Sequence, residues 1–237
     1  MTDYTSLIRS EIPEHETKLP KSKKIVKYRP FLVKEEKVLL VAKQNGKKED
    51  QLRAIENVIL SCSSLTKIDN LPLVDVEHLF LELRKNSIGE VVDLNFKCPE
   101  TGENIKVSLN LDDIKPTSNT NKKNIKLSTQ KNFEFRDYTF GDFKRSFSTL
   151  NSKFDEIVFL LSKIETPSQV IDCKSLTKKQ KSDIIDNLLP VEYKKLISEN
   201  NKTARYEHNL KYTTKSGEQK SLLVRGLFDF FCFPSAI

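Results

Sequence analysis

The chain has 237 residues, of which 37% are hydrophobic and 31% are charged, so it is long enough and apolar enough to bury a core. Six glycines and nine prolines exclude a collagen-like or low-complexity chain. The net charge is +7, but the basic residues are mostly lysines spread along the chain, which is typical of a solvated surface rather than a nucleic-acid-binding face.

The first half of the chain predicts an arm, an edge strand, three helices and a hairpin. Residues 1–24 alternate polar and small residues and are expected to form a flexible arm. Residues 25–33 have the pattern of an extended segment, which Pro30 restricts to a sheet edge or a docking surface. The remaining elements of residues 25–115 follow from helical spacing and then from alternation of apolar residues. They are a buried helix over residues 34–44, helices over residues 50–61 and 75–85, and a hairpin of residues 90–96 and 105–111.

The second half predicts a linker followed by further short elements. Residues 116–123 (Pro-Thr-Ser-Asn-Thr-Asn-Lys-Lys) have the composition of a linker. Residues 124–237 are expected to hold a second hairpin, helices, and a C-terminal hairpin that ends in an aromatic tail. The expected elements are a hairpin of residues 125–127 and 133–135, helices over residues 140–150, 154–161, 178–189 and 191–199, and strands near residues 205–212 and 221–225. The predicted fold class is therefore α+β, with short helices packed against antiparallel hairpins.

Two segments of the first half are echoed, in the same order, in the second half. Cys62-Ser-Ser-Leu-Thr-Lys67 matches Cys173-Lys-Ser-Leu-Thr-Lys178, and Cys98-Pro-Glu-Thr-Gly-Glu103 matches Thr213-Thr-Lys-Ser-Gly-Glu218. Such an echo is typical of two related helix-plus-hairpin halves. Short matches also arise by chance in a chain rich in Lys, Ser and Leu, so both interpretations stand at this point.

The second pair of echoed segments has the spacing of half a zinc knuckle, Cys-x-x-Cys-Gly. The residues at the matching positions are Cys98, Thr101 and Gly102 in the first turn and Thr213, Ser216 and Gly217 in the second. A structural zinc ion needs four thiolate or imidazole ligands, and only one thiol remains here. The glycines are expected to supply the positive φ of a tight turn, and the hydroxyls are expected to form local hydrogen bonds. We therefore expect structural turns without a metal or other cofactor, with a degenerate zinc-knuckle adaptor as the alternative.

No other arrangement of residues predicts catalysis. The histidines His15, His78 and His208 fall on an expected arm, helix and strand, and Asp112 and Asp113 fall where a solvated strand ends. The sequence contains no phosphate-binding glycine loop, dinucleotide fingerprint, zinc-protease motif or nucleophile elbow. We therefore expect a protein that is not an enzyme and has no small-molecule substrate.

The cysteines and the hydropathy pattern indicate where the protein resides. Four cysteines stand far apart, which predicts no disulfide framework. Asp3, Arg9 and Glu11 interrupt any apolar run at the N-terminus, so no signal peptide is expected. No stretch approaches the roughly 18 apolar residues of a membrane span. We expect a soluble protein of a reducing cytoplasm.

Two segments are candidate partner-binding sites. The basic tract Lys21–Arg29, together with Tyr28, Arg29 and Phe31, suits an acidic protein partner or, as an alternative function, a nucleic-acid backbone. The competing structural interpretation is an edge strand that lies over the helices. The C-terminal tail either folds back into the core or anchors another subunit. Its aromatic residues are Phe228, Phe230, Phe231 and Phe233.

Several motifs resemble those of one protein family. They are Lys27-Tyr-Arg-Pro-Phe-Leu-Val-Lys-Glu-Glu-Lys-Val-Leu-Leu40, Ala54-Ile55, Leu71-Pro72-Leu73, Asp75 and Phe80-Leu-Glu-Leu-Arg-Lys-Asn-Ser-Ile-Gly-Glu-Val-Val92. Together they resemble the baseplate hub family of T-even-like contractile-tailed phages, which includes a hub subunit and a related hub assembly factor. The resemblance covers residues 25–150 well and the rest more loosely. The family commonly carries a Cys-x-x-Cys-Gly turn, and Thr101 departs from that pattern, so metal binding is not carried over.

The resemblance implies a structural or assembly role in the central hub of a tail baseplate, without turnover. The implied partners are other tail and baseplate hub proteins, and neither nucleic acid nor a membrane span is expected. The implied location is the host cytoplasm during assembly or the tail baseplate of the virion.

Overall fold

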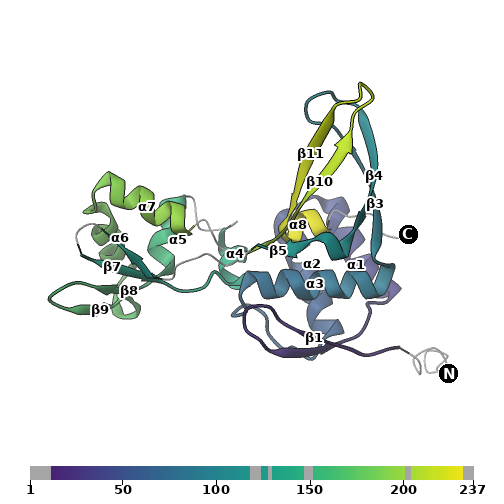
Figure 1. Ribbon diagram of the computed structural model, residues 1–237. Coiled ribbons are helices and arrows are strands. Elements are labelled where there is room, and N and C mark those ends of the chain that lie inside the picture. Colours follow the sequence, from purple (N-terminus) through teal and green to yellow (C-terminus); the bar gives the residue numbers. More distant parts are fainter. Residues whose placement is uncertain (1–11, 118–123, 128–129, 147–151, 201–203, 232–237) are drawn as a thin grey trace, which may run out of the picture. The chain divides into compact units, whose positions relative to one another are not determined.

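The computed structural model describes residues 12–117, 124–127, 130–146, 152–200 and 204–231. Helices and small antiparallel sheets make up these residues, which confirms the predicted α+β class (Figure 1). The backbone contacts divide the chain into two compact units. Unit 1 consists of residues 1–117 and 205–237, and unit 2 consists of residues 118–204. The chain therefore leaves unit 1, forms unit 2, and returns to complete unit 1.

This division corrects the predicted boundary between the halves. Strands β10 (Tyr206–Thr213) and β11 (Gln219–Arg225), which we expected within residues 124–237, belong to unit 1. The reason is that β10 pairs with β5 (Lys115–Pro116), the strand that ends the first pass through unit 1. The expected linker therefore begins inside a sheet at Pro116, and its residues 118–123 lie outside the described part of the chain.

The described part of the expected N-terminal arm is a hairpin. Strand β1 (His15–Lys18) pairs with β2 (Ile25–Tyr28) in antiparallel register. The turn between them is closed by a hydrogen bond of 2.8 Å from the Leu19 amide to the Lys24 carbonyl, and Lys23 adopts a φ of 61°. Composition gave no sign of this hairpin, because its strands are short and its positive-φ residue is a lysine instead of a glycine. Residues 1–11 of the expected arm lie outside the description.

Helices α1 (Val33–Asn45), α2 (Lys48–Cys62) and α3 (Leu73–Ile88) follow close to their predicted positions. Gly46 caps the C-terminus of α1 with a φ of 71°. Helix α3 lies at the centre of unit 1, and its apolar face is fully buried. Because this face carries Leu79, Phe80 and Leu83 at helical spacing, the sequence alone placed it correctly.

Two hairpins project side by side from the helices of unit 1 (Figure 1). The first joins β3 (Val91–Lys97) to β4 (Asn104–Asn110), and the second joins β10 to β11. A short 3-10 turn, η3 (Leu111–Asp113), connects β4 to β5, and helix α8 (Gly226–Phe231) follows β11 and packs against α2 and α3. We call these two hairpins together the arm; from here on, this name does not refer to the N-terminal arm that was expected for residues 1–24.

Unit 2, over its described residues, contains a four-stranded antiparallel sheet in the order β6-β7-β8-β9, with helices packed against it. The apolar core between sheet and helices includes Phe133, Ile157 and Leu196. Strands β8 and β9 were not predicted; the buried residues of β8, Leu161 and Ile164, are three positions apart and therefore show no period of two. The elements are β6 (Asn124–Lys126), β7 (Asn132–Phe135), α4 (Phe140–Ser146), α5 (Lys153–Leu160), β8 (Leu161–Glu165), β9 (Val170–Asp172), η4 (Cys173–Ser175), α6 (Lys178–Asp186) and α7 (Pro190–Asn200).

The echoed segments do not mark two related halves. Cys62 is the last residue of α2, whereas Cys173 opens the 3-10 turn η4 after a strand. The other two echoed segments do close hairpins, but both hairpins belong to unit 1. Only the second pair of echoed segments therefore has similar structures, and these are the two hairpin turns of one arm.

A buried ion pair connects α3 to the returning chain. Glu77 has no exposed surface, and its Oε1 lies 2.5 Å from Nε of Arg205. Its Oε2 accepts a hydrogen bond of 2.8 Å from the Tyr206 amide, at the start of β10. Burial raises the pKa of Glu77, and the Arg205 guanidinium opposes that effect.

We expect Glu77→Ala to destabilise unit 1 by ~3 kcal/mol, because the substitution leaves the guanidinium of Arg205 without its buried partner. Chemical unfolding followed by circular dichroism measures the change. Glu207→Ala is the matched control, since the pair of Glu207 with Arg225 (3.3 Å) is partly exposed and should contribute less than about 1 kcal/mol. Equal losses in the two variants would contradict the role assigned to the buried pair.

Candidate interaction site

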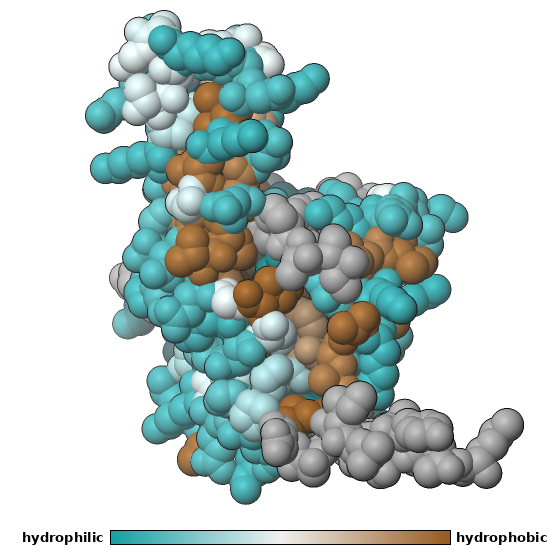
Figure 2. Space-filling view, turned by 90° about the vertical axis from the view of Figure 1, so that its right-hand side faces the viewer, coloured by the Kyte–Doolittle hydropathy of each residue, from teal (hydrophilic) through white to brown (hydrophobic). Residues whose placement is uncertain are grey.

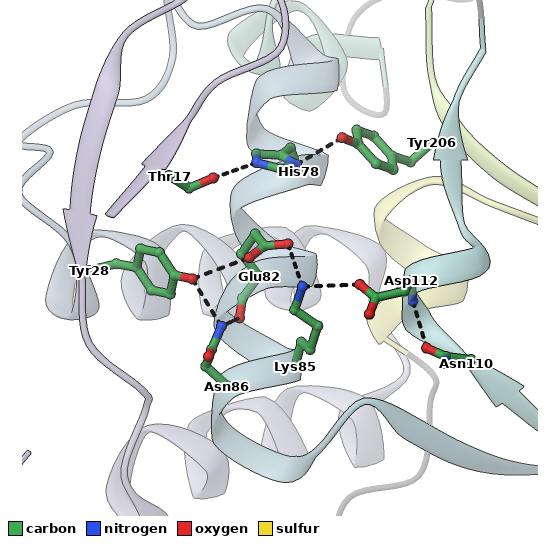
Figure 3. Close-up of polar contacts among 9 residues, drawn as sticks. All are labelled: Thr17, Tyr28, His78, Glu82, Lys85, Asn86, Asn110, Asp112 and Tyr206. Atoms are coloured by element: carbon green, nitrogen blue, oxygen red, sulfur yellow. Dashed lines mark hydrogen bonds and ion pairs between the residues drawn. The ribbon is translucent and has the colours of Figure 1, made fainter. Parts of the chain in front are cut away.

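One histidine of α3 joins strands from the two ends of the chain (Figure 3). Thr17 Oγ1, on β1, lies 2.7 Å from His78 Nε2, and Tyr206 Oη, on β10, lies 2.8 Å from His78 Nδ1. Burial lowers the pKa of His78, so the ring is neutral at physiological pH and can donate from one nitrogen and accept at the other. Both ring nitrogens are therefore engaged within unit 1.

The next turns of α3 hold β2 and the end of the first arm hairpin (Figure 3). The Tyr28 hydroxyl donates to the Glu82 carboxylate (3.2 Å) and accepts from Nδ2 of the Asn86 side chain (2.9 Å). Burial, helped by the nearby Glu82 carboxylate, raises the pKa of Tyr28 to about 12, which keeps its hydroxyl proton in place. Lys85 Nζ bridges Glu82 (3.0 Å) and Asp112 (3.1 Å). Asp112, which we expected at the end of a solvated strand, is thus part of an ion pair.

The basic tract is held against unit 1 by acidic side chains. The fully buried Asp75 carboxylate accepts backbone hydrogen bonds from Lys21 (2.7 Å) and Ser22 (2.9 Å). Arg29 lies 3.1 Å from Oε1 of Glu35 and also donates to a backbone carbonyl of α2. The charge of Arg29 is therefore compensated within the chain.

The aromatic residues that we expected in the first partner-binding segment are buried. Tyr28 is 4% exposed and Phe31 is 7% exposed. The Phe31 amide also donates a hydrogen bond of 2.8 Å to Ser87 Oγ on α3. This burial favours the edge-strand interpretation that the sequence left open.

The described part of the aromatic tail folds back onto the helices. Phe230 has no exposed surface, and Phe228 is half-buried with Lys48 Nζ 5.4 Å from its ring centroid. These contacts favour the core interpretation of the tail. The side chain of Phe231 and all of Phe233 lie outside the described residues.

The two hairpin turns at the tip of the arm are similar. The sequence comparison matched Cys98 with Thr213, but the structurally equivalent residue is Thr214. The Cys98 amide bonds to the Glu103 carbonyl (2.8 Å), and the equivalent bond in the second turn runs from Thr214, not Thr213, to Glu218 (2.9 Å). Cys98 and Thr214 are both buried, whereas Thr213 is exposed. The second turn is one residue shorter, which a gapless comparison of the sequences could not show.

In both turns, residues at or next to the positions where a zinc knuckle has its metal ligands form local hydrogen bonds instead. Hydrogen bonds from Thr101 and from Tyr212, whose hydroxyl lies 3.3 Å from Sγ, lower the pKa of Cys98 to about 7. In the second turn the hydroxyls of Thr214 and Ser216 lie 2.8 Å apart. The expected positive φ is observed in both turns, at the residues Gly102 (70°) and Gly217 (87°). Across the residues with described placement, no group of three or more His, Cys, Asp or Glu side chains is arranged to hold a metal ion.

The apolar side chains between the two hairpins are unevenly covered. Strand β4 lies against β10, and Leu109, Leu210 and Tyr212 are buried. Other inward-facing side chains are only half-buried, and Figure 2 shows hydrophobic side chains in a stripe along the projecting arm, bordered by hydrophilic ones. We call these half-buried residues the apolar stripe; they are Leu94, Phe96, Val107 and Leu222.

Helix α1 exposes residues that we expected to be buried. Val38 and Val41 are 44% and 56% exposed, and they line a groove of about 370 Å³ between α1 and α2. The helix instead turns Glu35 inward, because this carboxylate accepts a hydrogen bond of 2.7 Å from the Leu32 amide and pairs with Arg29. The apolar run in the sequence could not reveal this rotation.

The family described as T4 bacteriophage base plate protein matches residues 12–232, which span both units. The chain belongs to this family, and the resemblance inferred from its motifs is confirmed. It is a structural protein of the phage baseplate. Searches of curated proteins and of solved structures found no match. Among the helices in the described ranges, none has the length and apolar character needed to cross a membrane.

We predict that Tyr212→Phe raises the pKa of Cys98, because the variant lacks the hydroxyl that bonds to the sulfur. Burial raises the pKa of Cys62 to about 11 and also raises that of Cys173, so neither should ionise near neutral pH. The ultraviolet absorbance of the thiolate, titrated in wild type and in Cys98→Ser, isolates the Cys98 signal by difference.

The wild-type midpoint should lie at about 7. Tyr193→Phe, on α7, is the control and should leave it unchanged. A wild-type midpoint near the ordinary value for cysteine would contradict the hydrogen bonding at this turn.

Proposed function

We propose that this protein is a non-enzymatic component or assembly factor of the central hub of a contractile-tail baseplate, and that it acts through contacts with other hub proteins. The observation that carries the proposal is the family match over residues 12–232. The hub role is supported by the motifs of residues 27–40 and 80–92. The proposed location is the host cytoplasm during assembly and, if the protein is a component instead of an assembly factor, the tail baseplate of the virion.

The use of the buried titratable groups supports a non-enzymatic role. A catalytic acid or base must come within hydrogen-bond distance of a substrate proton. In unit 1, His78 and Glu77 instead bond to neighbouring side chains and backbone amides. In unit 2, the fully buried Asp142 pairs with Arg136 and with Arg145. These groups stabilise the fold.

The basic tract gives little support to the alternative of nucleic-acid binding. Binding to a phosphate backbone depends on cations that can replace counterions. Lys27 pairs with Glu16 on the neighbouring strand at 3.5 Å, and Arg29 pairs with Glu35. Tyr28, the aromatic residue of this tract, is buried. We therefore favour protein partners.

The proposal predicts that an affinity-tagged copy, expressed in phage-infected cells, sediments with baseplate intermediates and purifies with other hub proteins. Mass spectrometry of the gradient fractions and of purified virions measures this. A phage with a nonsense mutation in the gene should produce no complete tails, and a plasmid copy should restore them. Absence of the protein from both virions and hub intermediates would contradict the proposal.

A further inference from the structure

We propose that the arm of unit 1 docks an extended segment of another baseplate protein, one in which apolar and acidic side chains alternate. This inference rests on the proposed function and specifies the surface that performs it. Three properties of the arm carry it: incomplete apolar packing, unpaired strand edges, and exposed lysines that form no ion pair.

The apolar stripe is the first property. Leu94, Phe96 and Val107, from the first hairpin, and Leu222, from the second, point toward the space between the hairpins but remain half-exposed. The rings of Phe96 and Tyr212 meet edge to face, at a centroid distance of 5.3 Å. A partner that covers the stripe would remove this apolar surface from water, which is the main driving force for association.

The unpaired strand edges are the second property. Over the described residues the strand orders are β3-β4 and β11-β10-β5, so β3 and β11 each have a neighbouring strand on one side only. Both edge strands contribute to the apolar stripe, and each is seven residues long. Edge strands offer backbone donors and acceptors to an incoming strand. The arm therefore suits an extended segment, whose alternate side chains would face the stripe.

The charge of the arm is the third property and determines the chemistry of the segment. Two acidic side chains of the hairpins form ion pairs within the chain, Glu100 with Lys220 and Glu207 with Arg225, and Asp93 accepts a hydrogen bond from Ser108 but keeps its charge. The lysines adjacent to the inward-facing residues are exposed and have no ion-pair partner among the described residues. They are Lys97, Lys106 and Lys211. Acidic side chains on the segment would complement them.

A second copy of the chain fits this surface less well. Pairing two arms would bring the exposed lysines of both copies together, and like charges placed opposite each other oppose association. The charge therefore favours a different, acidic partner over self-association.

The test compares two pairs of substitutions in the full chain within infected cells. Leu94→Lys with Leu222→Lys places charge in the apolar stripe, and the matched control, Val38→Lys with Val41→Lys, adds the same charge to the exposed face of α1. We expect the stripe variant to show about a tenfold loss of co-sedimentation with baseplate intermediates, and the control to stay near wild type. Thermal unfolding of the purified variants shows whether both remain folded.

Charge reversal provides a second variant, in which only exposed side chains are replaced. Lys97→Glu with Lys106→Glu should also reduce co-sedimentation about tenfold. The control is Lys37→Glu with Lys47→Glu, at exposed positions on and after α1, and it should behave as wild type. Since these side chains are exposed, both pairs should remain folded, and thermal unfolding of the purified variants checks this.

The outcomes separate this inference from the proposed function. If the wild-type protein does not sediment with baseplate intermediates, the proposed function fails. If the wild type does, and both arm variants do so equally well, the docking surface is wrong while the function stands. If the arm substitutions instead abolish a dimer detected by light scattering, the partner is a second copy, and the acidic segment proposed here is wrong.

Discussion

Unit 1 depends on the burial of charged side chains along α3. Asp75 and Glu77 have no exposed surface, and Arg84 is 2% exposed. Removing such groups from water costs free energy unless hydrogen bonds and counter-charges replace the lost hydration. For Asp75 the replacement comes from the backbone of the N-terminal hairpin, and for Glu77 it comes from the start of β10. The buried carboxylates of α3 therefore have their hydrogen-bond and ion-pair partners only when both the N-terminal hairpin and the start of β10 are in place.

This dependence explains how a chain with an inserted unit still forms a defined arm. Unit 2 separates β5 from β10 in sequence, yet β10 pairs with β5 and begins at residues bonded to α3. His78 adds a contact from the same helix to β1 and β10. The base of the second hairpin is thus fixed by α3, and Lys85 fixes the end of the first through Asp112. A surface that must recognise another protein benefits from such fixed supports, because less conformational entropy is lost on binding.

The sequence predicted features that depend on local pattern. Helix α3 and the β3-β4 hairpin were placed correctly because their apolar residues have a clear period. The N-terminal hairpin was missed because its register is fixed by contacts with Asp75 and His78, far away in sequence. The outward rotation of Val38 and Val41 was missed because Glu35 is required at the start of α1.

The candidate site could be predicted only in part. Sequence reasoning singled out the turns at Cys98 and Gly217 but assigned them to separate halves, because nothing local shows that two distant hairpins share one arm. It selected Tyr28 and Phe31 as partner contacts by residue type, although tertiary packing buries them. The apolar stripe was missed, because its residues alternate like those of any half-buried strand. The incomplete packing between two hairpins becomes visible only in three dimensions.

Native-state hydrogen exchange of the wild-type protein, measured amide by amide over a range of denaturant concentrations, tests the central role of α3 most directly. The buried contacts of Asp75, Glu77 and His78 predict that the amides of β1–β2, α3 and the start of β10 open in one cooperative step with a common free energy. Exchange of β10 through a separate opening of lower free energy, with α3 still protected, would contradict this account.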